Sequence, residues 1–510
     1  MSDSLPLLSL CLAWPLLGAL SLAFIQNNQL AKRWALLVAS LELLLSVAVA
    51  WVFDAERGEF QLLEDYPWIP SLNIHYQLGV DGISILFLPV TALLTLMALL
   101  ASWNSVQHLN RFQLALMLGL ESVTIGVFTA LDLALFFLFW ELTLPPIFFL
   151  IGLWGIGAER RQAAMKYTLY MLFGGVPLLF GIILLAINHA HHTGGAIPED
   201  LAFGLPVLLN TPVPESAQGL IFLLLVLGFA VKAPLLPLHT WLPTAAIEAP
   251  TFLSALLVGL KLGVYGIIRF AIPLAPQAAL EHRWLLAIFG GVTLIYGALI
   301  ALQQTNLRRL LAYSSISHVG LVIVGVATFN LQGLQGAVLQ LVNFGIVAGS
   351  LMLIAGMIQQ RLGSTELIHL GGLATPMPRL TVLFFILALA SIGVPGTCGF
   401  PAELLMLLGT LQAYPALTMV ALFGAILGAA YLLGFVRKAF FGPVVHDSVA
   451  KAQDLRPREL VLLVVPVLLV LMIGLNPQWL LSWQEASLQS WWQRLGPVVS
   501  VIIESSDGSI

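Results

Sequence analysis

The segment LGFAVKAPLLPLHTW (residues 227–241) places Lys232 at the end of an apolar run and just before Pro234 and Pro237. A proline removes a backbone donor and breaks an α-helix. Charged side chains within a bilayer are costly and are therefore functional candidates by default. Broken helices at membrane depth are tolerated where they line a polar cavity, as at the ion sites of transporters. The segment predicts an ion site at a break in a spanning helix, which continues as a half-helix to about residue 247.

The chain around this segment has 510 residues, of which 59% are hydrophobic and only 9% are charged. A soluble domain carries roughly 25% charged residues. Apolar runs long enough to cross a bilayer recur throughout. We therefore expect an integral, all-α, multi-pass membrane protein without convincing strands. Fourteen spans are predicted near residues 5–24, 33–53, 80–103, 112–130, 132–153, 165–188, 218–237, 251–275, 284–303, 308–328, 332–358, 377–398, 413–436 and 459–480.

Composition also excludes several classes of function. The small net charge of −4 does not indicate a nucleic-acid partner. The only two cysteines, Cys11 and Cys398, lie in apolar runs, which excludes a metal or iron–sulfur site built from this chain's thiolates. The chain has no phosphate-binding loop motif, so no nucleotide is expected to drive it directly. After residue 480 we expect a Trp-rich interfacial tail without a further long helix.

Lysine and arginine are distributed unevenly between the loops, which predicts the orientation. Loops after odd-numbered spans carry 15 of them, and the opposite loops carry only four, Arg57, Arg269, Arg283 and Arg494. The fifteen are Lys32, Arg33, Arg111, Arg160, Arg161, Lys166, Arg308, Arg309, Arg361, Arg379, Arg437, Lys438, Lys451, Arg456 and Arg458. Because cytoplasmic loops hold the excess, both termini are expected on the non-cytoplasmic side.

Three further charges are predicted inside the membrane. Lys261 lies in the middle of a span in LLVGLKLGVYG (256–266), and Glu403 follows a Gly/Pro break in SIGVPGTCGFPAELLMLLG (391–409). Glu141 precedes a pair of prolines in FFLFWELTLPPIFFL (136–150), two spans before Lys232. A Glu–Lys pair that opens and closes is a physical switch for binding and releasing a proton. The alternative is a static salt bridge that only stabilises the fold.

Two histidines and one further glutamate are weaker candidates. His239 follows the helix break, and His318 lies beside several hydroxyls in RRLLAYSSISHVGLV (308–322). Histidine titrates in the range that a proton relay needs. Each could instead be a hydrogen-bonded core histidine. Glu121 in LGLESVTIG (118–126) is a secondary candidate.

The breaks near Lys232 and Glu403 share one design and lie five spans apart. This spacing predicts two five-helix units, which are often related as inverted repeats in transporters. We expect three N-terminal spans in residues 1–110, the first repeat in 111–280 and the second in 281–440. Residues 441–510 would hold the last span and the interfacial tail.

Several of these segments resemble the antiporter-like subunits of respiratory complex I, the NADH:quinone oxidoreductase. The similar segments are LDLALFFLFWELTLPPIFFLIGLWG (131–155), KAPLLPLHTWLPTAAIEAPT (232–251) and RRLLAYSSISHVGLVIVG (308–325). The resemblance covers nearly the whole chain and is greatest for the subunit M, or chain 4, branch. Residue 403 separates that branch from its paralogue subunit L, which usually has a lysine there.

The resemblance implies a proton-translocating membrane-arm subunit in a bacterial inner membrane, with antiporter-like neighbours on both sides. It implies no cofactor in this chain, and places FMN, iron–sulfur clusters and quinone in partner subunits. It carries over Glu141, Lys232, Lys261 and Glu403 as the proton path. His239 and His318 are carried over as relays, and Glu121 as a secondary group.

The chain departs from the family pattern at a few positions. LPTAA (242–246) stands where LPDAH is usual, so that Thr244 and Ala246 replace an acid and a histidine. Asn343 stands where a histidine is common. Alternative functions are a subunit of a multi-subunit cation/proton antiporter, of a membrane-bound hydrogenase or of a bicarbonate-uptake complex. A purely structural scaffold would not need four charges buried beside broken helices.

Overall fold

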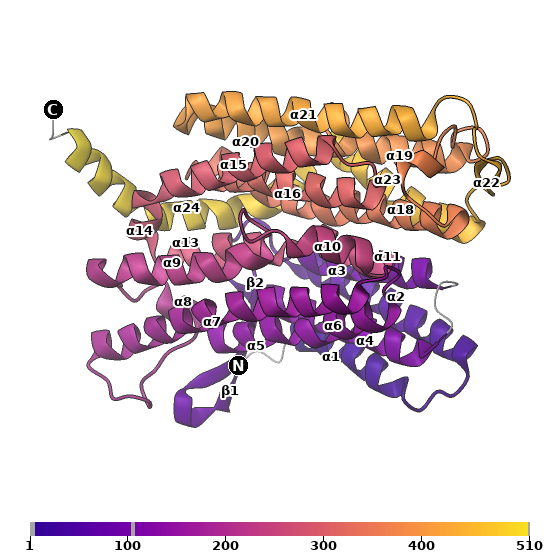
Figure 1. The fold of residues 1–510 in the computed structure, drawn as a ribbon. Helices are drawn as coiled ribbons and strands as arrows, with labels where there is room; N and C mark the ends of the chain where they lie inside the picture. Colours follow the sequence, from indigo (N-terminus) through magenta and orange to yellow (C-terminus); the bar gives the residue numbers. More distant parts are fainter. Residues whose placement is uncertain (1–5, 104–107, 508–510) are drawn as a thin grey trace.

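Long helices with roughly parallel axes build the molecule, whose structure is a computed structural model describing residues 6–103 and 108–507 (Figure 1). Within these residues, eleven helices are long and apolar enough to cross a membrane. Three shorter apolar helices span Leu7–Ser21, Phe87–Ser102 and Pro378–Ser391. The prediction of a mostly helical, multi-pass membrane protein is therefore confirmed.

The helices follow one another along the whole chain. The first group is α1 (Leu7–Ser21), α2 (Asn28–Val52), α3 (Phe87–Ser102), α4 (Asn110–Thr129), α5 (Leu133–Leu142), α6 (Leu144–Trp154), α7 (Arg160–Thr193) and α8 (Leu205–Leu208). The second is α9 (Glu215–Lys232), α10 (Trp241–Glu248), α11 (Thr251–Gly259), α12 (Leu262–Gly266), α13 (Ile272–Leu274), α14 (Pro276–Glu281), α15 (Arg283–Leu302), α16 (Leu307–Val326), α17 (Leu331–Asn343) and α18 (Gly349–Leu362). The third is α19 (Pro378–Ser391), α20 (Gly399–Ala413), α21 (Pro415–Phe440), α22 (Asp447–Ala450), α23 (Pro457–Leu475) and α24 (Gln478–Asp507).

Both predicted helix breaks are present. The chain leaves helical conformation between α9 and α10, directly after Lys232, and again between α19 and α20, before Glu403. The half-helix after Lys232 ends at Glu248, close to the predicted end at 247, and the half-helix that carries Glu403 ends at Ala413. A third break, not predicted, separates α11 from α12 at Leu260 and Lys261. The sequence between α11 and α12 contains no proline that would have indicated this break.

The expectation of no strands was wrong. The link between α2 and α3 contains an antiparallel hairpin of β1 (Gln61–Ile69) and β2 (Ile74–Val80), in which Tyr66 lies opposite Tyr76. Most of β1 is exposed or half-buried, so its sequence lacks the regular alternation that a strand with one buried face would show. Asn73, in left-handed conformation with φ of 51°, closes the turn.

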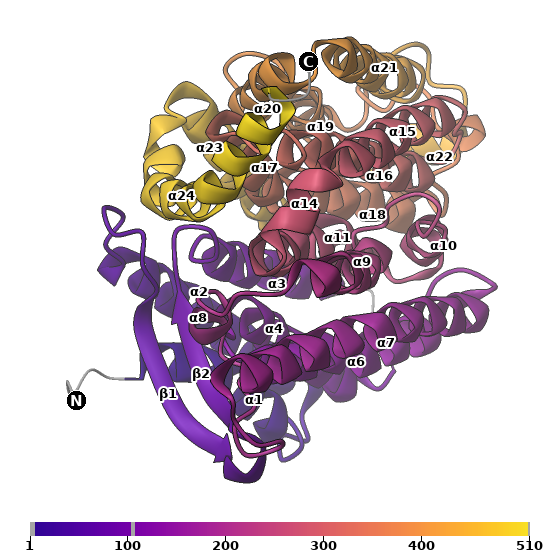
Figure 2. The same cartoon turned by 90° about the vertical axis from the view of Figure 1, so that its left-hand side faces the viewer.

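The expectation of a tail without a long helix was also wrong, because α24 covers Gln478–Asp507. Its buried Leu480, Leu488, Trp491 and Leu495 recur at spacings that place them on one helix face. Trp491 Nε1 donates to the carbonyl of Ile268 at 2.9 Å, which fixes α24 against the bundle. Figure 2 shows α24 beside α17 and α23, near the end of the bundle that bears the hairpin.

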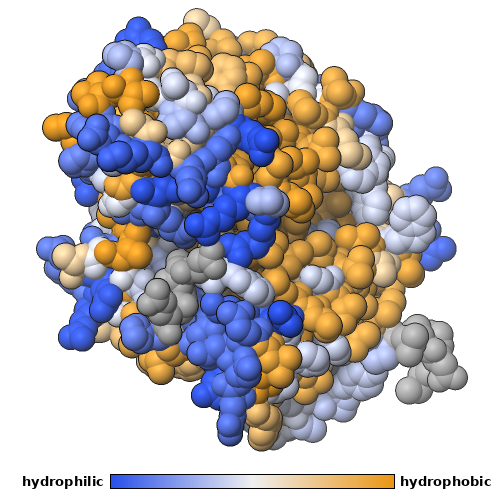
Figure 3. Space-filling model, turned by 90° about the vertical axis from the view of Figure 1, so that its right-hand side faces the viewer, coloured by the Kyte–Doolittle hydropathy of each residue, from blue (hydrophilic) through white to orange (hydrophobic). Residues whose placement is uncertain are grey.

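The outer helices present apolar side chains outward. On α7, the exposed apolar residues recur at the spacing of one helix face and are Leu169, Leu172, Phe173, Val176 and Phe180. This stripe suits the acyl chains of a bilayer. Figure 3 shows the opposite end of the bundle from α24, where hydrophilic residues gather in patches beside broad hydrophobic areas.

Candidate functional site

Lys232 is the last residue of α9, and its ammonium group is held by the backbone of a neighbouring helix. Lys232 Nζ donates to the carbonyl of Trp140 at 3.1 Å and to Thr143 Oγ1 at 2.9 Å. It also lies 3.8 Å from the centre of the Trp140 ring. A positive charge is favoured where helix carbonyls lack intrahelical partners, as at the end of α9 and at the α5–α6 junction.

Glu141 lies between these two partners in the sequence, but it does not share them. Its carboxylate faces Gly175 of α7, where only a residue without Cβ leaves enough space. Within the part of the chain that the structure describes, no ion pair shorter than 4 Å joins Glu141 to Lys232, although each lies within range of the other's charge. The two groups are therefore near neighbours without a closed salt bridge.

A cavity of about 50 Å³ adjoins Lys232. One water needs roughly 10–15 Å³ of such space, so the cavity has room for a few waters. Glu121 of α4 is 1% exposed and lines this cavity. The other polar groups in its wall are Thr91, Thr95, Thr124, Thr143 and Tyr167. The structure thus places the secondary candidate Glu121 at the same cavity as Lys232.

Lys261 lies at the unpredicted break between α11 and α12, and it is 4% exposed. Its Nζ has no hydrogen-bond partner among the described residues, and it lies 5.2 Å from the centre of the Phe344 ring. Phe344 begins a π-helical turn (Phe344–Ala348) between α17 and α18. The centre of the His318 ring is 6.3 Å from that of Phe344, so Phe344 is a shared neighbour of Lys261 and His318.

His318 and Glu403 form one cluster. His318 Nδ1 lies 3.8 Å from Glu403 Oε1, and its Nε2 lies 3.4 Å from the hydroxyl of Tyr431. That hydroxyl is also 2.8 Å from Ser314 Oγ. Gly393, in the break before α20, has φ of +68° and packs directly against the Glu403 carboxylate. The break therefore makes the space that Glu403 occupies.

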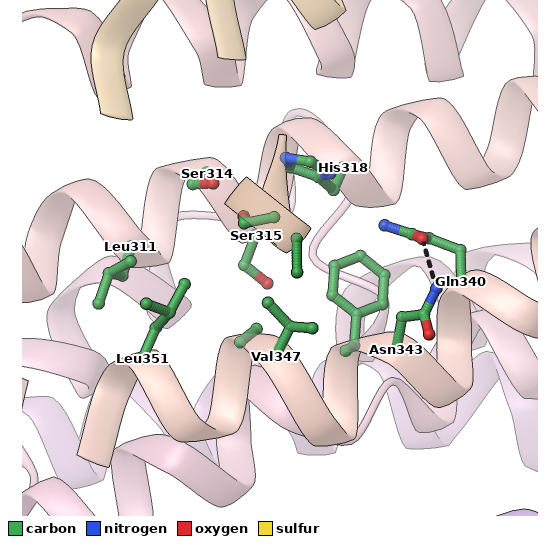
Figure 4. A pocket seen from close by; sticks show the side chains of 12 residues that line it. Leu311, Ser314, Ser315, His318, Gln340, Asn343, Val347 and Leu351 are labelled. Carbon is green, nitrogen blue, oxygen red and sulfur yellow. Dashed lines mark hydrogen bonds between the residues drawn. The ribbon is translucent and has the colours of Figure 1, made fainter. Parts of the chain in front are cut away.

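A small cavity of about 20 Å³ extends beside this cluster (Figure 4). His318, Ser314 and Ser315 reach it from α16, and Gln340 and Asn343 reach it from α17. Asn343 Nδ2 donates to Gln340 Oε1 at 3.2 Å and to the carbonyl of Cys398 at 2.8 Å. Asn343 therefore caps a carbonyl in the break before α20, as well as lining the cavity.

His239 stands apart from both clusters. Neither of its ring nitrogens has a hydrogen-bond partner in the described part of the chain, and its ring centre is 5.1 Å from that of Tyr296. Lys166 of α7 binds the same break, donating to the carbonyl of Thr240 at 2.9 Å and to Thr244 Oγ1 at 3.1 Å. Thr244 thus takes a lysine partner where the family pattern has an acid.

Sequence reasoning missed Thr143, Lys166 and Tyr431. Each is a polar residue within an apolar helix or at its end, and this was the available signal. Their partners lie on other helices, which the sequence does not reveal. Within the described chain, no group of three or more His, Cys, Asp or Glu side chains could hold a metal ion.

These features define a class of membrane protein in which buried Lys, Glu and His side chains lie at breaks in spanning helices. The family model described as NADH:quinone oxidoreductase/Mrp antiporter, transmembrane, matches residues 130–428. The chain belongs to this family, as its sequence predicted.

Curated relatives cover almost the whole chain. It is 35% identical to NADH-quinone oxidoreductase subunit M of Rickettsia prowazekii, over 95% of this chain and 98% of that protein. It is 36% identical to subunit M of Rhodobacter capsulatus, over 92% and 93%.

The fold is also similar to solved structures. A chain of respiratory complex I from Thermus thermophilus matches with a TM-score of 0.87 and 30% identity, covering 96% of this chain and 99% of that one. A chain of the Mrp complex from Dietzia matches with a TM-score of 0.85 and 24% identity, covering 97% and 99%. The second likeness shows the fold alone.

Proposed function

We propose that this chain is the M-type membrane-arm subunit of a bacterial NADH:quinone oxidoreductase and that it translocates protons. The carrying observation is that Lys232, Lys261 and Glu403 are all buried at helix breaks, with water-sized cavities beside Lys232 and His318. The similarity to subunit M over nearly the full length of both proteins supports the assignment.

The proposed path runs from Glu141 and Lys232 through Lys261 to the His318–Glu403 cluster. Among the residues that the structure describes, no carboxylate is bonded to Lys232, so a change in its charge acts on Glu141 through space. Glu121 exchanges protons with water in the Lys232 cavity. His239 is the weakest candidate for this proton path, because the Lys232 site and the His318–Glu403 cluster both form without it.

The finer architecture is part of the same proposal. Fourteen spans place both termini on the non-cytoplasmic side of the inner membrane, and two inverted five-helix units carry the two matching breaks. Antiporter-like subunits flank the chain, and FMN, iron–sulfur clusters and quinone belong to other subunits. Redox chemistry there supplies the energy, and this chain acts as a translocase without a redox centre of its own.

Replacing Glu141 or Lys232 by alanine should abolish NADH-driven proton pumping while the complex remains assembled. Pumping is measured as quenching of a pH-sensitive dye in inverted membrane vesicles, against the NADH oxidation rate in the same vesicles. Lys451→Ala is the control, because Lys451 is an exposed loop lysine. Full pumping in assembled E141A and K232A complexes would refute the proposed roles.

A cation/proton antiporter subunit is the second candidate, supported by the shared fold of the Mrp complex chain. The proteins that co-purify with the chain separate the two functions. Redox subunits support the first, whereas a set of membrane subunits without redox partners supports the second. The same test covers the hydrogenase and bicarbonate-uptake alternatives.

A further inference from the structure

A cavity of about 300 Å³ lies at the hairpin end of the bundle, away from the proposed proton path. Its wall combines the segment before β1, the π-helical turn η2 (Ile267–Ala271), the short α8 and the last helix, α24. This volume lies at the lower end of the range of ligand pockets in proteins, about 300–1,000 Å³. Figure 2 shows α24 at the end of the bundle where these segments meet.

Arg269 of η2 is a buried cation with unused donors at this cavity. It is 4% exposed, and its Nη1 lies 2.5 Å from Asp81 Oδ2. Its Nε and Nη2 have no hydrogen-bond partner among the described residues. An unsatisfied buried donor costs roughly 1–3 kcal/mol, and more on a charged group. Arg269 therefore keeps an incompletely satisfied positive charge in the wall of the cavity.

Asp81 does not supply acceptors for Nε and Nη2, because both of its carboxylate oxygens already accept other hydrogen bonds. Its Oδ1 accepts the backbone N–H groups of Ile83 and Ser84, at 3.0 and 3.1 Å, while Oδ2 binds Arg269. The aspartate thus fixes the guanidinium through Nη1, while Nε and Nη2 are buried next to the Tyr265 side chain. A positive charge fixed in this way attracts an anionic group such as a phosphate.

A second arginine and two hydroxyls complete the polar wall. Arg494 of α24 is exposed and lines the cavity together with Ser487 and Ser490. Only four arginines lie on the cation-poor side by the loop count, and two of them, Arg269 and Arg494, meet here. Glu59 supplies a negative charge at the same cavity.

Apolar groups beside the charges favour a lipid over a free anion. The centre of the Phe60 ring lies 4.7 Å from Arg269 Cζ, and Trp491 forms part of the same wall. Leu63, at the start of β1, also lines the cavity and is 56% exposed. The glycerol backbone and the first acyl carbons of a lipid would cover these apolar surfaces, whereas inorganic phosphate would leave them exposed to water.

We propose that this cavity binds the phosphodiester of a zwitterionic phospholipid from the adjacent leaflet. Arg494 donates to the phosphate oxygens, the fixed charge of Arg269 attracts them, and Glu59 faces the ammonium of the headgroup. The lipid then joins α24 to the hairpin segment and stabilises this end of the chain.

The test uses the intact purified complex and a phosphatidylethanolamine analogue with a photoreactive group near its headgroup. Crosslinked peptides are mapped by mass spectrometry. Crosslinking to α24 and to residues 55–63 should fall by about tenfold in Arg494→Gln, the expected effect of losing a charge-assisted hydrogen bond. R269Q should show a similar loss, but it also breaks the Asp81 ion pair, so R494Q is the primary variant.

Arg283→Gln is the matched control, because Arg283 is exposed and is on the same side by the loop count but does not line the cavity. Equal crosslinking in R494Q and the unaltered chain would overturn the proposal, as would an equal loss in R283Q. Crosslinking that excess inorganic phosphate removes would assign the site to a free anion and would also overturn the lipid. Because proton pumping is measured separately, failure here is distinguishable from failure of the proposed function.

Discussion

Tyr431 carries no charge, yet its hydroxyl reaches both His318 and Ser314. This contact limits where the imidazole can point and gives Nε2 a neutral neighbour, while Nδ1 faces Glu403. A proton that leaves Glu403 through His318 therefore meets a hydroxyl pair on the far side of the ring. At the scale of the residue, the proposed proton path would use this cluster as a short relay rather than as an isolated ion pair.

Tyr431→Phe should reduce NADH-driven proton pumping by about fivefold, in keeping with the roughly 1 kcal/mol that one hydrogen bond contributes. The ring remains, so packing is preserved and the complex should assemble normally. Proton release per electron pair in vesicles is the measurement. Tyr66→Phe in the exposed hairpin is the control. Unchanged pumping in Y431F would remove Tyr431 from the relay.

At the scale of the element, each break both ends a helix and creates room for an ionisable group. Lys232 is the last residue of α9, and Lys261 lies between α11 and α12. Glu403 sits in the first turns of α20, where Gly393 from the preceding break packs against it. The Asn343 side chain donates a hydrogen bond to the carbonyl of Cys398 in that same break.

Gly393→Ala should displace the Glu403 carboxylate and reduce pumping, because an added Cβ would lie 2.8 Å from Glu403 Cδ. The positive φ adds a backbone cost of about 1–2 kcal/mol. Gly396→Ala is a closely matched control, since Gly396 has φ of +89° but nothing lies within 4 Å of its added Cβ. Both variants carry the backbone strain, and only G393A meets Glu403. Equal pumping in the two variants would show that the contact is irrelevant.

At the scale of the whole molecule, the two water-sized cavities have no lining residue in common. Lys261 lies between them, because its chain neighbours Leu260 and Leu262 line the first cavity and Phe344, whose ring centre is 5.2 Å from Lys261 Nζ, lines the second. A proton path across the chain therefore needs either movement of Lys261 or additional water. The direction of that path relative to the cell depends on which end of the bundle faces the cytoplasm, and the loop charges predict the hairpin end to be outside.

Single cysteines test this orientation, because the native Cys11 and Cys398 are buried. Ala196→Cys, in the exposed link after α7, should react with a membrane-impermeant maleimide on intact spheroplasts. Ser448→Cys, exposed on α22, should react only after the membrane is opened. The reverse pattern would show that the Lys and Arg count misassigns the two sides.

Local chemistry carried much of the prediction. Hydropathy located the membrane helices, Pro and Gly located the breaks after Lys232 and before Glu403, and the motifs led to the correct family. These features depend on neighbouring residues only, so the sequence expresses them directly. The hairpin and α24 were missed because neither has an apolar run of spanning length.

The sequence by itself determined that ionisable side chains would be buried beside broken helices in a membrane protein of this family. Only the tertiary structure decided their partners: Trp140 and Thr143 for Lys232, and Glu403 with Tyr431 for His318. The physical reason is that a partner depends on the rotation and depth of helices packed together. Packing over the whole bundle fixes both, and no local pattern of residues encodes them.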